Sequence, residues 1–136
     1  MPRAGLTRER LILAASELAD REGLSALTLA ALARQFEVKL ASLYSHVRNG
    51  EDLKIGVALS ALDMLADLAD EAVAGRAGKA AIVALADVHR RFARDHPGLF
   101  EATRFPLPAE AAQGSGGARL SRTMRAALRA YALSEA

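Results

Sequence analysis

Apolar residues recur every three or four positions along most of the chain, which is the spacing of one face of an α-helix. The first such run covers residues 7–23, where Gly23 is placed to end a helix. Its inward face is formed by Leu11, Ile12, Ala15, Leu18 and Ala19. The pattern predicts an opening helix that packs across the elements following it.

Two short helices joined by a tight turn are predicted between residues 28 and 47. Thr28 can cap the first helix by accepting a backbone N–H, and the apolar face of that helix carries Leu29, Leu32, Ala33 and Phe36. Val38, in the turn, is expected to be buried between the crossing helices. The second helix covers residues 39–47, with an apolar side of Leu40, Leu43, Tyr44 and Val47. This layout is typical of a helix-turn-helix, a unit that reads DNA.

Longer helices are predicted downstream. Asn49 is an N-cap pattern for a helix from about Glu51 to Ala74, with Leu53, Val57, Leu62, Leu65, Leu68 and Ala72 on its apolar side. A helix over residues 79–95 is stopped by Pro97, and its inner stripe is Ile82, Leu85, Ala86, His89, Phe92 and Ala93. A last helix, over residues 121–132, carries Met124, Ala127, Leu128 and Tyr131 inward. The fold class is therefore predicted to be all-α.

Composition and charge narrow the class of protein. Of the 136 residues, 51% are hydrophobic and 25% are charged, which is the balance of a globular chain. The net charge is only +2, so DNA binding would require basic side chains to cluster on one face. The absence of cysteine excludes disulfides and thiolate metal sites and is compatible with a reducing cytoplasm. With neither a signal pattern nor a long apolar run, we expect a cytoplasmic protein without a membrane segment.

Residues 28–53, TLAALARQFEVKLASLYSHVRNGEDL, resemble the N-terminal domain of TetR-family transcriptional regulators. In that family a Thr-led helix and a Gly-Val turn precede a Leu-Tyr pair and a capped helix, and residues 7–23 resemble its first helix. Three residues depart from the family pattern: Glu37 replaces the turn glycine, Val47 the usual Phe, and Gly50 the Lys that commonly follows the cap. These departures bear on DNA affinity more than on fold.

The resemblance implies a helix-turn-helix DNA-binding domain at residues 1–50. The segment from Lys39 to His46 would enter the major groove, with Lys39, Leu40, Ala41 and Ser42 nearest the bases. Phosphates would be contacted by Tyr44, His46 and Thr28. Arg3, in a short N-terminal arm, would reach the minor groove or the backbone, or would simply be solvated.

The resemblance also implies a helical ligand-binding and dimerisation domain at residues 51–136. The protein would be a ligand-responsive repressor, binding a palindromic operator as a homodimer with half-sites about 34 Å apart. An unknown small-molecule effector would release the DNA. The candidate lining residues, of a kind more often found as plain core, are Met64, Leu68, His89, Phe92, Phe100 and Phe105. Family members close with two further helices that form the dimer interface, whereas this sequence stops at Ala136. We therefore expect either a truncated chain or another mode of dimerisation.

Two other classes of protein remain as alternatives. For an enzyme, the best metal ligands are His89 and His96, with Asp87 and Asp95 nearby, but the histidines lie about two helical turns apart. The chain also lacks a nucleophile elbow and a phosphate-binding glycine loop, so we predict no enzyme, no cofactor and no metal. The other alternative is a helical interaction protein whose helix-turn-helix no longer binds DNA. A stripe of arginines on the last helix, Arg119, Arg122, Arg125 and Arg129, is either a solvated face or a surface for an acidic partner.

Overall fold

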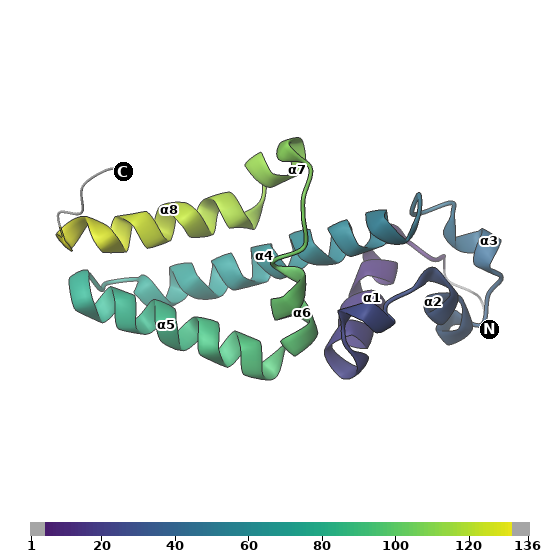
Figure 1. The fold of residues 1–136 in the computed structure, drawn as a ribbon, viewed down its shortest axis with the longest axis horizontal. Helices are drawn as coiled ribbons and strands as arrows, with labels where there is room; N and C mark the ends of the chain where they lie inside the picture. Colours follow the sequence, from purple (N-terminus) through teal and green to yellow (C-terminus); the bar gives the residue numbers. More distant parts are fainter. Residues whose placement is uncertain (1–4, 132–136) are drawn as a thin grey trace.

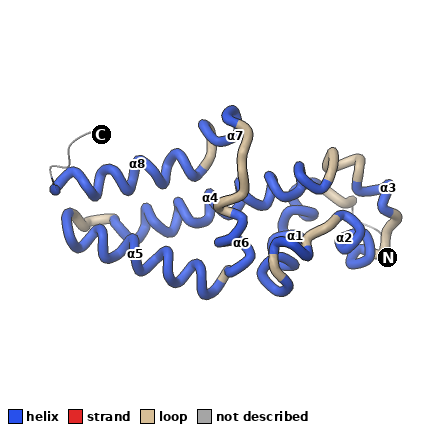
Figure 2. Tube along the Cα trace, in the orientation of Figure 1, coloured by secondary structure: helices blue, strands red, loops and turns tan. Residues whose placement is uncertain are grey.

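One long helix, α4 (Gly50–Val73), runs through the middle of the molecule and joins its two halves (Figure 1). The N-terminal unit consists of α1 (Arg8–Glu22), the 3₁₀ turn η1 (Leu24–Ala26), α2 (Leu29–Phe36) and α3 (Leu40–Leu43). The C-terminal unit consists of α5 (Gly78–Asp95), α6 (Pro97–Ala102), α7 (Ala109–Gln113), α8 (Gly116–Leu128) and η2 (Arg129–Tyr131). This computed structural model describes residues 5–131, and all regular structure within them is helical (Figure 2). The prediction of an all-α fold is confirmed.

Side-chain caps define where the helices of the N-terminal unit begin. The Thr7 hydroxyl oxygen accepts the Arg10 N–H at 3.1 Å, and the Thr28 hydroxyl oxygen accepts the Ala31 N–H at 3.1 Å. Asn49 Oδ1 accepts the Asp52 N–H at 2.8 Å and so starts α4. The caps predicted at Thr28 and Asn49 are therefore confirmed, because a cap depends on residues only three positions apart.

The core follows α4 from one unit to the other. The inward residues predicted for α1 and α2 are buried or half-buried, and Leu11, Leu32, Leu43, Leu53 and Val57 are fully buried. Val38, predicted to be buried, is half-buried against this core. Leu68, predicted on the apolar side of α4, is 40% exposed because it faces an open cleft.

The predicted inner stripes of the last two long helices are partly wrong. In α5 the buried residues are Ala81, Ala84, Leu85, Val88 and Phe92, whereas Ala86 is exposed and Ile82, His89 and Ala93 are half-buried. In α8 Ala127 is buried as predicted, but Met124 and Leu128 are exposed, and so is Tyr131 in η2. The reason is that α5 and α8 both pack against α4 and against each other. Between them they leave an open groove, the α5–α8 groove, which is lined by Ile82, Leu85, Ala86, His89, Met124 and Leu128.

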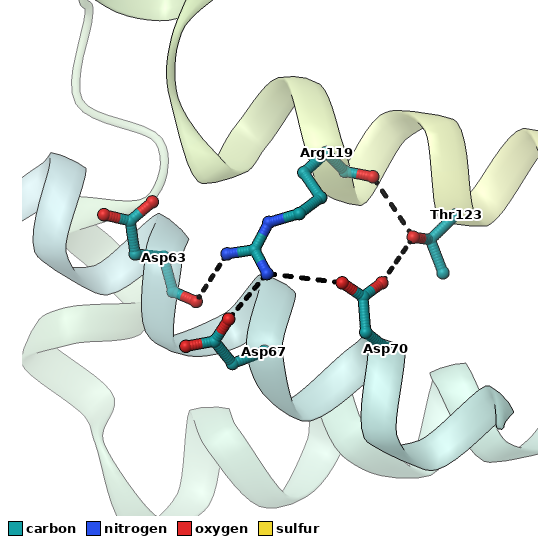
Figure 3. Close-up of polar contacts among 5 residues, drawn as sticks. All are labelled: Asp63, Asp67, Asp70, Arg119 and Thr123. Carbon is teal, nitrogen blue, oxygen red and sulfur yellow. Dashed lines mark hydrogen bonds and ion pairs between the residues drawn. The ribbon is translucent and has the colours of Figure 1, made fainter.

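A polar clamp on the outer side of the bundle fastens α8 to α4 (Figure 3). Arg119 Nη1 lies 2.6 Å from Asp67 Oδ1 and 3.3 Å from Asp70 Oδ2, and Thr123 donates its hydroxyl to Asp70 Oδ1 at 2.7 Å. The hydrogen bond to Asp67 raises the pKa of Arg119 above its ordinary value. Arg119 therefore does not belong to the predicted arginine stripe, of which Arg122, Arg125 and Arg129 remain exposed.

Candidate nucleic-acid interface

The turn between α2 and α3 passes through a left-handed residue. Glu37 has φ 54° and ψ 43°, and its N–H donates to the Arg34 carbonyl at 3.2 Å. The Val38 N–H donates to the Ala33 carbonyl at 3.0 Å, which closes the end of α2. Left-handed backbone is costly for any residue with a Cβ, and the family pattern has glycine here. Glu37 thus preserves the turn geometry at a cost in local strain.

The second helix of the motif is shorter than predicted. Regular α-helix covers only Leu40–Leu43, and the N–H groups of His46 and Val47 both donate to the Leu43 carbonyl, at 2.9 and 3.1 Å. The first of these bonds closes a tighter, three-residue turn, whereas the second has the four-residue spacing of an α-helix, so the segment up to Val47 is one helical turn followed by irregular turns. The prediction of a helix over residues 39–47 is wrong in its length, although the position of the element is right.

The exposed side of α3 carries most of the predicted DNA-contacting residues. Leu43 is fully buried and Val47 is 3% exposed, so these two side chains anchor the segment to the core. The exposed side chains on α3 and beside it include Lys39, Leu40, Ala41, Ser42 and Tyr44. The prediction that Leu40 and Tyr44 lie on the apolar side is wrong, because one helical turn can bury only the positions that face its neighbours.

The remaining predicted contacts lie around this surface. Thr28 is exposed, and because its oxygen accepts the Ala31 N–H, its hydroxyl proton is available to a phosphate. His46 is half-buried, with its carbonyl oxygen turned toward Arg8. Arg3 lies outside the described residues. Arg48, exposed and adjacent to the Asn49 cap, is a further cation beside this surface and is not among the predicted contacts.

Arg8 joins the end of α3 to the start of α4. Its guanidinium donates to both carboxylate oxygens of Asp52, at 2.9 and 3.2 Å, and to the His46 carbonyl at 3.2 Å. Asp52 Oδ2 also accepts the Arg48 N–H at 3.0 Å. The hydrogen bond from Arg8 lowers the pKa of Asp52 and raises that of Arg8. No pattern in the sequence indicates this role of Arg8, since nothing local connects residues 44 positions apart.

The six predicted effector-lining residues do not converge on one cavity. Leu68 and Phe92 line a cleft of about 630 Å³ between α4 and α5, whereas His89 faces the α5–α8 groove of about 240 Å³. Phe105 lines a hollow of about 510 Å³ beside Thr28 and Gly50, next to the N-terminal unit. Met64 is 38% exposed, and Phe100 is half-buried under the Arg104 guanidinium, 5.4 Å from its ring centroid. Only Leu68 and Phe92 share a lining.

The alternative metal site is not assembled. His89 Nδ1 lies 2.7 Å from the Leu85 carbonyl oxygen, and His96 Nδ1 lies 2.7 Å from Asp20 Oδ2. Among residues 5–131, no three His, Asp or Glu side chains are grouped so that they could hold a metal ion. Within the same range, no helix combines the length and apolar character needed to cross a membrane.

Comparisons with known proteins cover both halves of the chain. Residues 82–136 match the family model of the tetracyclin repressor-like C-terminal domain. The uncharacterized HTH-type transcriptional regulator YobS of Bacillus subtilis is 37% identical over 101 residues, which are 74% of this chain and 53% of the relative. The uncharacterized HTH-type transcriptional regulator Rv0681 of Mycobacterium tuberculosis is 40% identical over 105 residues, 76% of this chain and 48% of the relative. The chain spans about half the length of these two relatives.

Proposed function

We propose that this chain, which belongs to the TetR family of transcriptional regulators, represses transcription by binding a palindromic operator as a homodimer. The observation that carries this proposal is the surface of α3. Its polar and small side chains are exposed, while Leu43 and Val47 hold the segment to the core from the other side. A surface of this kind can approach base edges without disturbing the fold.

The exposed residues of α3 have distinct roles in this proposal. Lys39 pairs with a guanine or a phosphate, Ser42 donates to or accepts from a base edge, and Leu40 or Ala41 contacts a thymine methyl group. Tyr44, His46 and Thr28 contact phosphates. Arg48 supplies a further phosphate contact two residues before Gly50, the position at which the family usually has a lysine.

The start of α4 separates the two functions that we propose. We assign DNA binding to residues 1–50 and effector binding and dimerisation to residues 51–136, so that α4 transmits changes from one to the other. The effector cleft proposed is the space between α4 and α5, because its volume of about 630 Å³ falls in the range of small-molecule sites and it includes Leu68 and Phe92. Occupation of this cleft would change the spacing of the two DNA-binding units in the dimer.

The test of DNA binding is a selection of random duplex DNA against the purified chain, with its oligomeric state measured in the same buffer. Enrichment of an inverted repeat by a dimer is the expected result. If a folded sample enriches no sequence at low salt, the helix-turn-helix does not bind DNA by itself, and the alternative of a helical interaction protein is favoured.

Substitutions of residues beside α3 test whether this surface contacts the DNA. Lys39→Ala and Tyr44→Ala should each weaken operator binding by about tenfold, because a good base contact contributes about 1–3 kcal/mol and a hydrogen bond to a charged group about 1.5–3 kcal/mol. Only Lys39→Ala should also reduce the dependence of affinity on salt, because Lys39 is charged and Tyr44 is neutral. Ser121→Ala, on the exposed side of α8, is the matched control and should bind as the unmodified chain does. Equal affinities for all three variants would contradict the assigned surface.

A further inference from the structure

A carboxylate near the end of α1 caps a helix of the C-terminal unit. Asp20 Oδ1 accepts the Leu99 N–H at 2.9 Å, and Asp20 Oδ2 lies 2.7 Å from His96 Nδ1, which must therefore carry a proton. Leu99 belongs to α6, and His96 is the residue just before that helix. Both oxygens of one side chain are thus committed to residues 76 and 79 positions away.

The backbones of α1 and α6 meet at the same place. A Cβ built on Gly98 would overlap the backbone of Ala19 and lie 2.6 Å from the Asp20 nitrogen, so only glycine permits this approach. Leu99 and Ala102 of α6 are buried at 3% and 0% exposure. α6 also packs on α4 and α5 and lies between α5 and α1 (Figure 1). The joint therefore combines close packing of α6 on α1 with a polar contact that is partly exposed, since the His96 side chain is 40% and the Asp20 side chain 20% exposed.

This joint gives the N-terminal unit a second attachment to the rest of the molecule. The first attachment is α4 itself, and a long helix by itself permits bending and twisting between its ends. A second point of attachment, away from the axis of α4, restricts both movements. We propose that Asp20 is a positioning residue for DNA binding, which holds the N-terminal unit in one orientation relative to the C-terminal unit through His96 and Leu99.

The joint also borders the cleft between α4 and α5. His96 and Phe92 both line that cleft, and their rings lie 5.4 Å apart. A molecule bound in the cleft would contact His96 on one side, while Asp20 contacts it on the other. The inference rests on the proposed DNA-binding function, and it adds the residues through which the cleft and the DNA-binding surface are connected.

Spin-label distances test the orientation without any DNA. The chain has no cysteine, so Gln35→Cys on α2 and Ser121→Cys on α8, both at exposed positions, give a unique pair of labels. Dilution with unlabelled chain removes distances between subunits. The unmodified joint should give one narrow distance distribution, and Asp20→Ala should broaden or shift it. Glu17→Gln, an exposed carboxylate on the same helix, is the matched control and should leave the distribution unchanged.

A second, milder variant distinguishes a change in orientation from a loss of folding. His96→Ala keeps the Asp20 cap on Leu99 and should broaden the distribution less than Asp20→Ala does, with the helical circular dichroism retained. On unlabelled chain, each variant that broadens the distribution should also weaken operator binding, by about tenfold for Asp20→Ala. Unchanged distributions in both variants, or broadened distributions with unchanged operator affinity, would overturn the proposal. If the unmodified chain binds no DNA at all, the proposed function fails, while the distance measurement still decides whether Asp20 holds the two units together.

Discussion

Two arginines fasten helices to α4, one in each unit, and their surroundings differ. Arg8 in the N-terminal unit and Arg119 in the C-terminal unit have similar side-chain exposures, 38% and 37%. The side-chain exposures of their carboxylate partners differ: Asp52 is 18% exposed, whereas Asp67 is 70% and Asp70 is 41% exposed. Asp52 also accepts the Arg48 N–H, and its own N–H is capped by Asn49. From this difference we expect the contact at Asp52 to stabilise the fold more than those at Asp67 and Asp70, because a sheltered carboxylate with several hydrogen bonds is harder to replace with water.

The largest effect is expected from Asp52→Ala. This change removes the partner of the Arg8 guanidinium and the acceptor of the Arg48 N–H, so the free energy of unfolding should fall by about 2–3 kcal/mol. Urea denaturation measures the loss. Asp52→Asn, which keeps one oxygen acceptor, should lose less, and equal losses for the two variants would show that the charge of Asp52 contributes little.

The stabilisation from Asp52 should depend on pH. Arg8 lowers the pKa of Asp52 below its ordinary value of 3.8, so this stabilisation is present above about pH 4. It is lost as the pH falls through the lowered pKa of the folded state, where the carboxylate becomes protonated. The difference in unfolding free energy between the unmodified chain and Asp52→Asn should therefore shrink below about pH 4. A difference that stays constant down to about pH 2 would contradict this assignment.

The N-terminal unit should also gain stability from one change. Left-handed backbone costs a residue with a Cβ about 1–2 kcal/mol. Replacing it with glycine removes this cost, but glycine loses more conformational entropy on folding, which offsets about 0.5–1 kcal/mol of the gain. Glu37→Gly should therefore raise the free energy of unfolding by up to about 1.5 kcal/mol. Glu37→Ala serves as the control, because it removes the same carboxylate without relieving the strain, and it should show no such gain.

The smallest effect is expected at the exposed clamp. Arg119→Ala should lower the midpoint of thermal unfolding by less than Asp52→Ala does, since Asp67 and Asp70 remain hydrated once the arginine is gone. Raising the salt concentration screens exposed charges and should reduce the effect further. Arg122→Ala, on the exposed side of the same helix, is the matched control. A loss at Arg119 as large as that at Asp52 would remove the contrast between the two contacts.

Prediction from the sequence was most successful where neighbouring residues decide the structure. The caps at Thr28 and Asn49, the end of α1 at Gly23 and the position of the turn at Glu37 were all predicted from residues within four positions of one another. It was least successful on the faces of α5 and α8, where partners distant in the chain decide which residues are buried. The six effector candidates illustrate the same limit, because helical spacing identifies a stripe of residues without identifying the cavity that the stripe lines.

From the amino-acid sequence it follows that the chain is helical, where α1, α2, α4 and α5 begin and end to within about one residue, and which segment resembles a DNA-reading motif. These features follow from hydrogen bonds between residues three or four positions apart and from the 3.6-residue period of the helix. The tertiary structure alone decided that Leu40 and Tyr44 face outward, that Arg8 joins α3 to α4, and that Asp20 caps α6. Contacts between residues 38 to 79 positions apart have no local signal, because they form only when whole helices have packed against one another.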